Sequence, residues 1–290
     1  MSLTRTAAFR HLRLPFSWFL MPAFLLGWLA TPQVSPGNLL LLFGILHLLV
    51  YPSSNAYNSH QDQDEGPIGG MEHPPKPPES LRYISLGMDV LALALGIWLH
   101  WGAALGLLAY ILASRAYSHR ALRLKKYPLA GFFTVVIFQG PWIMALVAVF
   151  GRADFAWSNV WQPGWLYLAS ALMLAGTYPL TQIYQHEADK RDGVLSLSAW
   201  LGIMGTFRFS ALAFLLAGPA LLIPLYLQNR VALLLLLSLA LLPVLGWFVY
   251  WWRACARDVA AVNYKNTMRM NMLASTLLNI ALLLACILNL

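Results

Sequence analysis

The sequence predicts an all-α, polytopic membrane protein with nine transmembrane helices. Hydrophobic residues make up 59% of the 290 residues and charged residues only 10%, whereas charged residues form about 25% of a soluble domain. The mean hydropathy is +0.62, and apolar runs of about 20 residues, the length that crosses a hydrocarbon core as a helix, recur along the chain. These observations exclude an ordinary water-soluble domain.

The predicted helices occupy nine apolar runs spread over the whole chain. We place them at residues 15–31, 38–54, 83–100, 102–117, 129–150, 164–184, 209–227, 231–251 and 270–290. Several runs contain Pro or Gly, which membrane helices tolerate where neighbours satisfy the freed backbone groups. No soluble segment or repeat separates the runs, so we expect one integral membrane domain over residues 1–290.

Basic residues set the expected orientation. With nine spans and a cytoplasmic N-terminus, all of the 19 Lys and Arg residues except Arg152 and Arg230 lie on the cytoplasmic side, in agreement with the positive-inside rule. We therefore expect the C-terminus to lie outside, with the protein in a bacterial inner membrane. Because topology explains the net charge of +8, no nucleic acid partner is needed.

Acidic residues gather on the same predicted side. Six of the 11 Asp and Glu residues form one group after the second run and one after the sixth: Asp62, Asp64, Glu65, Glu187, Asp189 and Asp192. Residues four apart share a helix face, which pairs Asn58 with Asp62 and Gln185 with Asp189. Oxygen ligands of this kind suit Mg²⁺, which takes one or two carboxylates and binds substrate phosphates. The two groups predict a magnesium–diphosphate site.

The loop after the fourth run supplies positive charge for such phosphates. It contains Arg115, Arg120, Arg123, Lys125 and Lys126. Arg forks match phosphate oxygens and Lys acts as a point charge. Lys190 and Arg191, next to Asp189, are candidates for the same role from the other half of the chain.

Each of these features also has an ordinary structural explanation. A carboxylate just outside a membrane helix is commonly a solvated cap, and a basic loop can anchor the protein to anionic lipids. Buried Asp89, in the third run, is equally a functional candidate and an acceptor of structural hydrogen bonds. The functional hypothesis rests on the coincidence of both amide–acid pairs and the basic loop on one membrane face.

The chain resembles the UbiA superfamily of intramembrane prenyltransferases along nearly its whole length. The resemblance lies in Arg13-Leu14-Pro15 before the first run, an Asn-Asp-x-x-Asp-x-x-x-Asp motif after the second, a YS…RLK element, and a second Asp-rich motif after the sixth run. In the first motif Asn58 and Asp62 match. In the YS…RLK element Tyr117, Ser118, Arg123 and Lys125 match, and in the last motif Asp189 matches.

The chain departs from the family pattern at three positions. Ser59 and Gly66 stand where the first motif usually has Asp, and Gln185 stands where the second has Asp. Two explanations remain open. In the first, the protein keeps its activity and holds either a single magnesium ion or a rearranged cluster through Asp64, Glu65 and Glu187. In the second, it has lost catalysis.

The resemblance implies transfer of a polyprenyl group from its diphosphate to a lipophilic acceptor, for example an aromatic one, within the bilayer and with Mg²⁺ as cofactor. Its implied catalytic residues are Asp62, Asp189 and Lys125. The implied diphosphate-binding residues are Arg123, Lys125, Tyr117, Lys190 and Arg191. The implied metal ligands are Asn58, Asp62, Asp64, Glu65, Gln185 and Asp189.

Two other functions compete with the enzyme. A membrane lipid-binding or regulatory protein that keeps the fold without the chemistry is motivated by the replaced carboxylates. A small-solute transporter fits the number of spans, but its site would lie near the membrane midplane, and most of the acids here gather at one face. The sequence leaves the acceptor, the prenyl chain length and the oligomeric state open.

Overall fold

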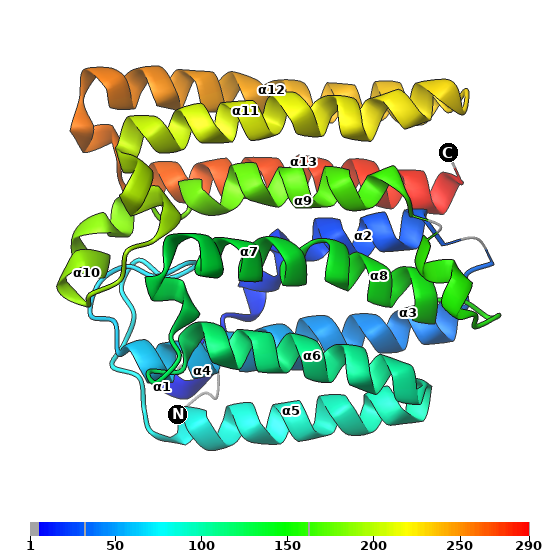
Figure 1. Cartoon of the computed structure of the whole chain (residues 1–290), viewed down its shortest axis with the longest axis horizontal. Helices are drawn as coiled ribbons and strands as arrows, with labels where there is room; N and C mark the ends of the chain where they lie inside the picture. The colour runs from blue at the N-terminus through cyan, green and yellow to red at the C-terminus, as the bar shows by residue number, and fades with distance from the viewer. Residues whose placement is uncertain (1–5, 32, 162, 290) are drawn as a thin grey trace.

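The computed structural model describes residues 6–31, 33–161 and 163–289, and within these ranges the protein consists of helices and loops with no β-strand. The helices lie side by side along one common direction (Figure 1). In chain order they are α1 (Ala7–Leu12), η2 (Leu14–Phe19), α2 (Met21–Leu29), α3 (Pro36–Phe43), η3 (Gly44–Val50), α4 (Tyr51–Asp62), α5 (Ser80–Leu99), α6 (Trp101–Ser118), η4 (Leu124–Lys126), α7 (Pro128–Gln139), α8 (Pro141–Phe150), η5 (Trp157–Trp161), α9 (Trp165–Leu180), η6 (Ile183–Gln185), α10 (His186–Arg191), α11 (Leu197–Leu227), α12 (Val231–Arg257), η7 (Val259–Ala261) and α13 (Tyr264–Leu288).

Helices occur at each of the nine predicted positions, but not all of them qualify as membrane spans. Of the described residues, six helical segments are long and apolar enough to cross a membrane, or seven if the bent pair formed by α1–η2 and α2 counts as one span. α9 has only 16 residues, and α6 is not apolar enough. The fold class is therefore all-α and polytopic, while nine transmembrane helices remain a prediction.

One of the predicted boundaries was wrong. The seventh apolar run was placed at 209–227, but α11 already begins at Leu197, capped by the Ser196 hydroxyl, which accepts a hydrogen bond from the Ala199 amide. Gly202, at φ +70°, bends this helix near its start. The run at 129–150 is divided at Gly140, because Pro141 has no amide hydrogen to continue the ladder.

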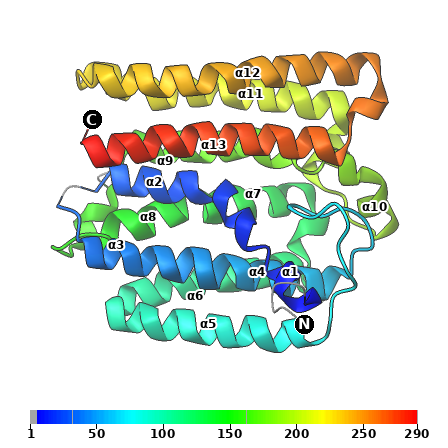
Figure 2. The same ribbon diagram turned by 180° about the vertical axis from the view of Figure 1, so that it is seen from behind.

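The outer helices present apolar side chains to their surroundings. α5 and α12 lie on opposite sides of the bundle in both views (Figures 1 and 2). In the most apolar 18-residue stretch of each helix, only 28% of α5 and 22% of α12 is buried within the protein. Exposed side chains such as Trp98, Leu215 and Leu239 form an apolar surface that requires lipid, as expected of an integral multi-pass membrane protein.

The loops are divided between the two ends of the bundle. α10, α1 and the loops that follow α4 and α6 lie at one end, and the carboxyl end of α13 lies at the other (Figure 1). The predicted orientation places the end that carries α10 in the cytoplasm and the carboxyl end of α13 outside. Arg5 and Leu290, which entered that prediction, lie outside the described residues.

The loop between α4 and α5 is fastened to the N-terminal segment. Arg10 donates to the carbonyl of His73 at 2.9 Å, and Arg13 donates to the carbonyl of Gly69 at 3.1 Å. A side chain at Gly69 would meet the ring of Phe16, because a Cβ there would lie 2.7 Å from that ring. This close packing holds the loop in place at the end of the bundle that carries α10.

Asp89, left open by the sequence, takes part in a buried ion pair. Its side chain is 10% exposed and pairs with Arg115 of α6. The Ser53 hydroxyl of α4 donates to Asp89 Oδ1 at 2.5 Å, and Arg115 lies over the ring of Tyr57, 4.0 Å from its centroid. The pair joins α4, α5 and α6, which assigns Asp89 the structural role of the two considered.

We expect Asp89→Ala to lower the stability of the protein by about 3 kcal/mol, because removing one partner leaves the Arg115 charge buried and unpaired. The thermal unfolding midpoint in detergent measures the effect. Glu79→Ala is the control, since Glu79 directly precedes α5, its side chain is 87% exposed and it lies 3.9 Å from His60 Nδ1, and such exposed pairs contribute little. Equal midpoints for the two variants would contradict the structural role.

The positive-inside rule makes a second prediction, that the end carrying α10 faces the cytoplasm and the C-terminus lies outside. Reporter fusions at the C-terminus test it. A periplasmic-active phosphatase should be active there, and a cytoplasm-dependent fluorescent protein should be dark. The reverse pattern would show that the basic loops face away from the cytoplasm.

Candidate active site

Asp62 is the last residue of α4, and its position follows from the local chain. Gln63 adopts a left-handed conformation at φ 55° and ends the helix. One turn before, the Asn58 amide donates to Asp62 Oδ2 at 2.8 Å and to the Ser118 hydroxyl at 3.0 Å. The side chain of Asp62 is only 3% exposed, so a carboxylate at the end of a membrane helix is here enclosed by protein.

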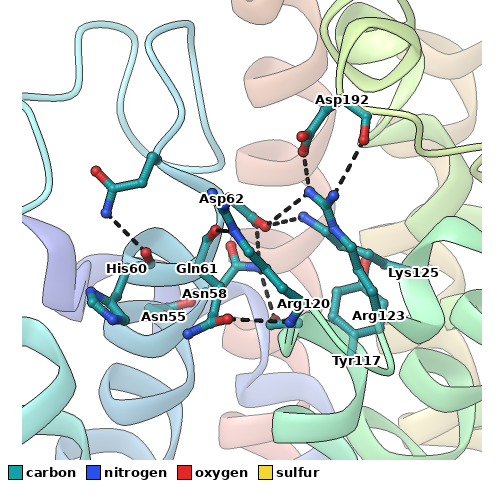
Figure 3. Close-up of polar contacts among 12 residues, drawn as sticks. Asn55, Asn58, His60, Gln61, Asp62, Tyr117, Arg120, Arg123, Lys125 and Asp192 are labelled. Atoms are coloured by element: carbon teal, nitrogen blue, oxygen red, sulfur yellow. Dashed lines mark hydrogen bonds and ion pairs between the residues drawn. The ribbon is translucent and has the colours of Figure 1, made fainter.

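The loop between α6 and α7 brings two cations to the other oxygen of Asp62. Lys125 Nζ lies 2.5 Å from Oδ1, and an Arg123 amino group lies 3.7 Å from the same atom. Figure 3 shows Asp62 between Asn58 on one side and these two cations on the other. Arg120 fastens the loop to α4 by donating to the carbonyl of Gln61 at 2.9 Å.

The second acidic segment reaches the same place from the other half of the chain. Gly193, at φ +67°, turns the chain after α10, and the Val194 amide donates to the Asp189 carbonyl at 2.8 Å. Arg123 pairs with the Asp192 carboxylate (Figure 3). Arg123 thus contacts Asp62 and Asp192 and joins the ends of α4 and α10 through one guanidinium group.

Asp62, Lys125, Asp189 and Asp192 line a cavity of about 340 Å³, whereas Arg123 does not belong to its lining. Its polar part contains Asp62, Asp64, Asp189, Asp192 and Lys125. Away from this end its walls come chiefly from α2, α7, α9 and α13 and are mostly apolar, with Ala23, Leu26, Phe138, Met173, Leu174 and Leu278 among them, although Gln139 and Ser170 add polar groups. One cavity therefore joins a charged entrance to an apolar interior.

The carboxylates at the entrance repel one another. The pKa of Asp189 is raised to about 6, chiefly by burial and less by nearby Asp64 and Asp62, while Lys125 opposes the rise. Burial also raises the pKa of Asp64, and the charge of Asp62 adds to that effect. Four carboxylates at the entrance, Asp62, Asp64, Asp189 and Asp192, thus meet three cations, Lys125, Arg123 and Arg13, a balance that favours a further cation.

The donor chemistry fits magnesium in one particular way. In the described part of the chain, no group of three or more His, Cys, Asp or Glu side chains is close enough to hold one ion. An all-protein cage is therefore absent from those residues. Asp62, Asp64 and Asp189 are hard oxygen donors around one cavity, which fits a magnesium ion held by one or two carboxylates and completed by phosphate oxygens.

The structure brings most, but not all, of the predicted site residues to the cavity. Its lining includes Asn58, Asp62, Asp64, Tyr117, Lys125, Gln185 and Asp189. The Gln185 amide is engaged by the α4–α5 loop, donating to the Pro67 carbonyl at 3.2 Å. Glu65, Lys190 and Arg191 are exposed and do not line the cavity.

Other residues at the site were not assigned from the sequence. Asp192 was noted in the acidic group but given no role, although its place next to Gly193 was a usable signal. Tyr178 lines the cavity and its hydroxyl lies 2.6 Å from that of Tyr117, while Gln182 donates to it at 3.0 Å. No sequence pattern pointed to this pair, because Tyr178 lies within an apolar run.

Comparison with known proteins agrees with this fold. The sequence profile described as the UbiA prenyltransferase family matches residues 19–273. The chain belongs to this family. No curated protein sequence matches it.

Three solved structures share the fold at low sequence identity. A UbiA homologue from Archaeoglobus fulgidus bound to DMAPP and Mg²⁺ is 16% identical, with a TM-score of 0.71 over 98% of this chain and 100% of that one. An apo UbiA homologue from Aeropyrum pernix K1 is 17% identical, with a TM-score of 0.71 over 93% and 98%. A digeranylgeranylglyceryl phosphate synthase structure is 19% identical, with a TM-score of 0.63 over 97% and 96%.

The raised pKa of Asp189 makes the stability of the protein pH-dependent. The folded protein holds this proton up to about pH 6, compared with the ordinary value of 3.8. Between these values the folded state binds more protons than the unfolded state, so the free energy of unfolding falls as pH rises through this window. We expect Asp189→Asn to lose less thermal stability than wild type between about pH 4 and about pH 7.

Differential scanning fluorimetry of both proteins across that window checks this expectation. Glu187→Gln is the matched control, because Glu187 lies on the same short helix but is exposed and does not line the cavity. Parallel pH profiles for Asp189→Asn and wild type would show that Asp189 ionises as an ordinary surface carboxyl.

Proposed function

We propose that the protein transfers a prenyl group from a prenyl diphosphate to a lipophilic acceptor within the membrane, and that it requires Mg²⁺. The observation that carries this proposal is the single cavity with a charged entrance and an apolar interior. A lipid diphosphate has the same division, since its headgroup is an anion and its tail is a hydrocarbon. The cavity matches both parts at once.

The residues at the entrance would act on the leaving group. As the allylic C–O bond breaks, its electron pair leaves with the diphosphate, and negative charge grows on the phosphate oxygens. Lys125 lines the cavity and can neutralise that charge directly, while Arg123 lies behind it, 3.7 Å from Asp62. Such preorganised electrostatics are commonly the largest catalytic contribution. When bound, magnesium would supply further neutralisation of the diphosphate, held by Asp62 with Asp64 or Asp189 and assisted by Asn58.

The apolar interior would protect the electron-deficient carbon that remains. Leu20, Met173 and Leu278 belong to walls that keep water away from the isoprenoid chain. The acceptor then forms the new bond to this carbon and gives up a proton. Exclusion of water decides whether the acceptor or water captures the prenyl group.

The comparisons support this proposal at the level of the family. The chain's fold is that of a homologue bound to DMAPP and Mg²⁺, which supports a prenyl diphosphate substrate and magnesium here. A non-catalytic, lipid-binding protein is the second candidate. It is favoured by one observation, that Asp62 is already neutralised by Lys125 in the described structure.

The substitution Asp62→Asn separates the two functions. We expect it to lower turnover by about 100-fold or more, since it removes the best-enclosed carboxylate at the entrance, and to raise the Mg²⁺ concentration needed for half-maximal activity. Purified protein with labelled prenyl diphosphates, candidate aromatic or other lipophilic acceptors and varied Mg²⁺ provides the measurement.

Glu65→Gln serves as the control, because Glu65 is exposed and lies outside the cavity lining. It should titrate with Mg²⁺ as wild type does. Turnover of Asp62→Asn equal to that of wild type would make Asp62 a polar helix cap. Binding of prenyl diphosphate with no turnover in wild type would establish the lipid-binding function instead.

A further inference from the structure

Both oxygens of the Asp62 carboxylate already have a partner in the described structure. Oδ2 accepts from Asn58 at 2.8 Å, and Oδ1 lies 2.5 Å from Lys125 Nζ. The side chain is 3% exposed, so water is also largely excluded. A metal ion that is to bind Asp62 directly therefore meets the Asn58 amide at one oxygen, and at the other the Lys125 ammonium group with Arg123 3.7 Å away.

Of the two partners, Lys125 is the one that a metal ion would displace. A magnesium–oxygen bond is about 2.1 Å long, which would put the ion within about 5 Å of Lys125 Nζ, with like charges facing each other. The Asn58 amide is neutral and can rotate to offer its oxygen. Lys125 is carried by η4 in the loop between α6 and α7, and its long side chain can move without any change in the helices.

Once displaced, the Lys125 ammonium group needs another anion. Its side chain is 13% exposed, so it remains inside the cavity entrance with little access to water. Asp189 lines the same entrance, but pairing with it would remove a second carboxylate from the metal. A diphosphate at the entrance would satisfy Lys125 and leave both carboxylates for the cation.

We propose that Lys125 occupies the cation position at Asp62 in the empty site, so that the divalent cation and the diphosphate each bind tightly only when the other is present. This inference rests on the proposed function and adds the order in which its ligands bind. Coupling of two ligands is reciprocal, so the free protein has low affinity for either one alone. In the free protein the carboxylates therefore hold no divalent cation, and they bind one only together with the diphosphate.

Metal binding without turnover tests the proposal. Mn²⁺ takes oxygen ligands as Mg²⁺ does, and the free ion can be followed by electron paramagnetic resonance with the full-length protein in nanodiscs. Without any diphosphate, Lys125→Gln should bind Mn²⁺ about tenfold more tightly than wild type, within the range usual for coupled sites. Lys125→Arg, which keeps a cation at Asp62, should bind as weakly as wild type.

Lys126→Gln is the matched control for charge. It removes one positive charge from the same loop, but Lys126 is exposed and does not line the cavity, so its Mn²⁺ affinity should equal that of wild type. In a second arm, inorganic pyrophosphate is added and its own Mn²⁺ binding is subtracted with a protein-free titration. Wild type should gain about tenfold in Mn²⁺ affinity and Lys125→Gln much less.

Asp62→Asn distinguishes failure of this inference from failure of the proposed function. If Asp62→Asn weakens Mn²⁺ binding but Lys125→Gln does not strengthen it, the competition is wrong and the magnesium site remains. Equal gains for Lys125→Gln and Lys126→Gln would also overturn the competition, because general charge would explain them. If Asp62→Asn leaves Mn²⁺ binding unchanged, both the inference and the assignment of the metal site fail.

Discussion

The enclosure of the Asp62 carboxylate is the constraint on which the rest of the site depends. A charge that is only 3% exposed is tolerated when its oxygens have partners, because an unpaired buried charge is very costly. The partners come from separate segments: Asn58 from α4, and Lys125 and Arg123 from the α6–α7 loop. Arg123 in turn reaches Asp192, so one carboxylate organises both halves of the bundle at this end.

Several helices of the bundle are interrupted. α7 and α8 are divided at Gly140, α9 ends shortly after Pro179, and α11 bends at Gly202. Each irregularity has a local cause in Pro or Gly. The peripheral helix α5 contains none of these interruptions. α7 and α9 line the cavity, whereas α11 contributes no residue to its lining and the peripheral α12 contains Pro243, so the interruptions are not confined to the cavity.

The all-α fold could be predicted from the sequence because apolar runs and their lengths reflect the membrane directly. The Asn58–Asp62 pair could also be predicted, since the helical spacing places both side chains on one face. The boundaries of α11 could not, because Gly202 permits a bend that periodicity does not show. The number of spans likewise depends on packing, since α6 and α9 are helices whose length or composition alone would not make them spans.

Charged residues at the site were predictable where neighbours along the chain share a helix face, and at Lys125, where the chain matches a motif of the family. Glu65 follows Asp64 directly, yet the chain leaves α4 after Asp62, and Glu65 does not line the cavity. Lys190 and Arg191 are exposed although Asp189 lines the cavity. The contact between Arg123 and Asp192 joins residues far apart in the sequence, and no local pattern indicates such pairs.

The wide separation of these partners along the chain also has a consequence for biosynthesis. Translation delivers Asp62 first, Lys125 only after α5 and α6 have been made, and Asp192 after the four further α-helices α7 to α10. A nascent chain therefore holds the carboxylate of α4 at the membrane surface, hydrated and without its cation, until the sixth helix has been inserted. Asp62 becomes enclosed only when the α6–α7 loop packs on α4 and brings Lys125 to its carboxylate. The helices up to α4 cannot form this end of the bundle by themselves.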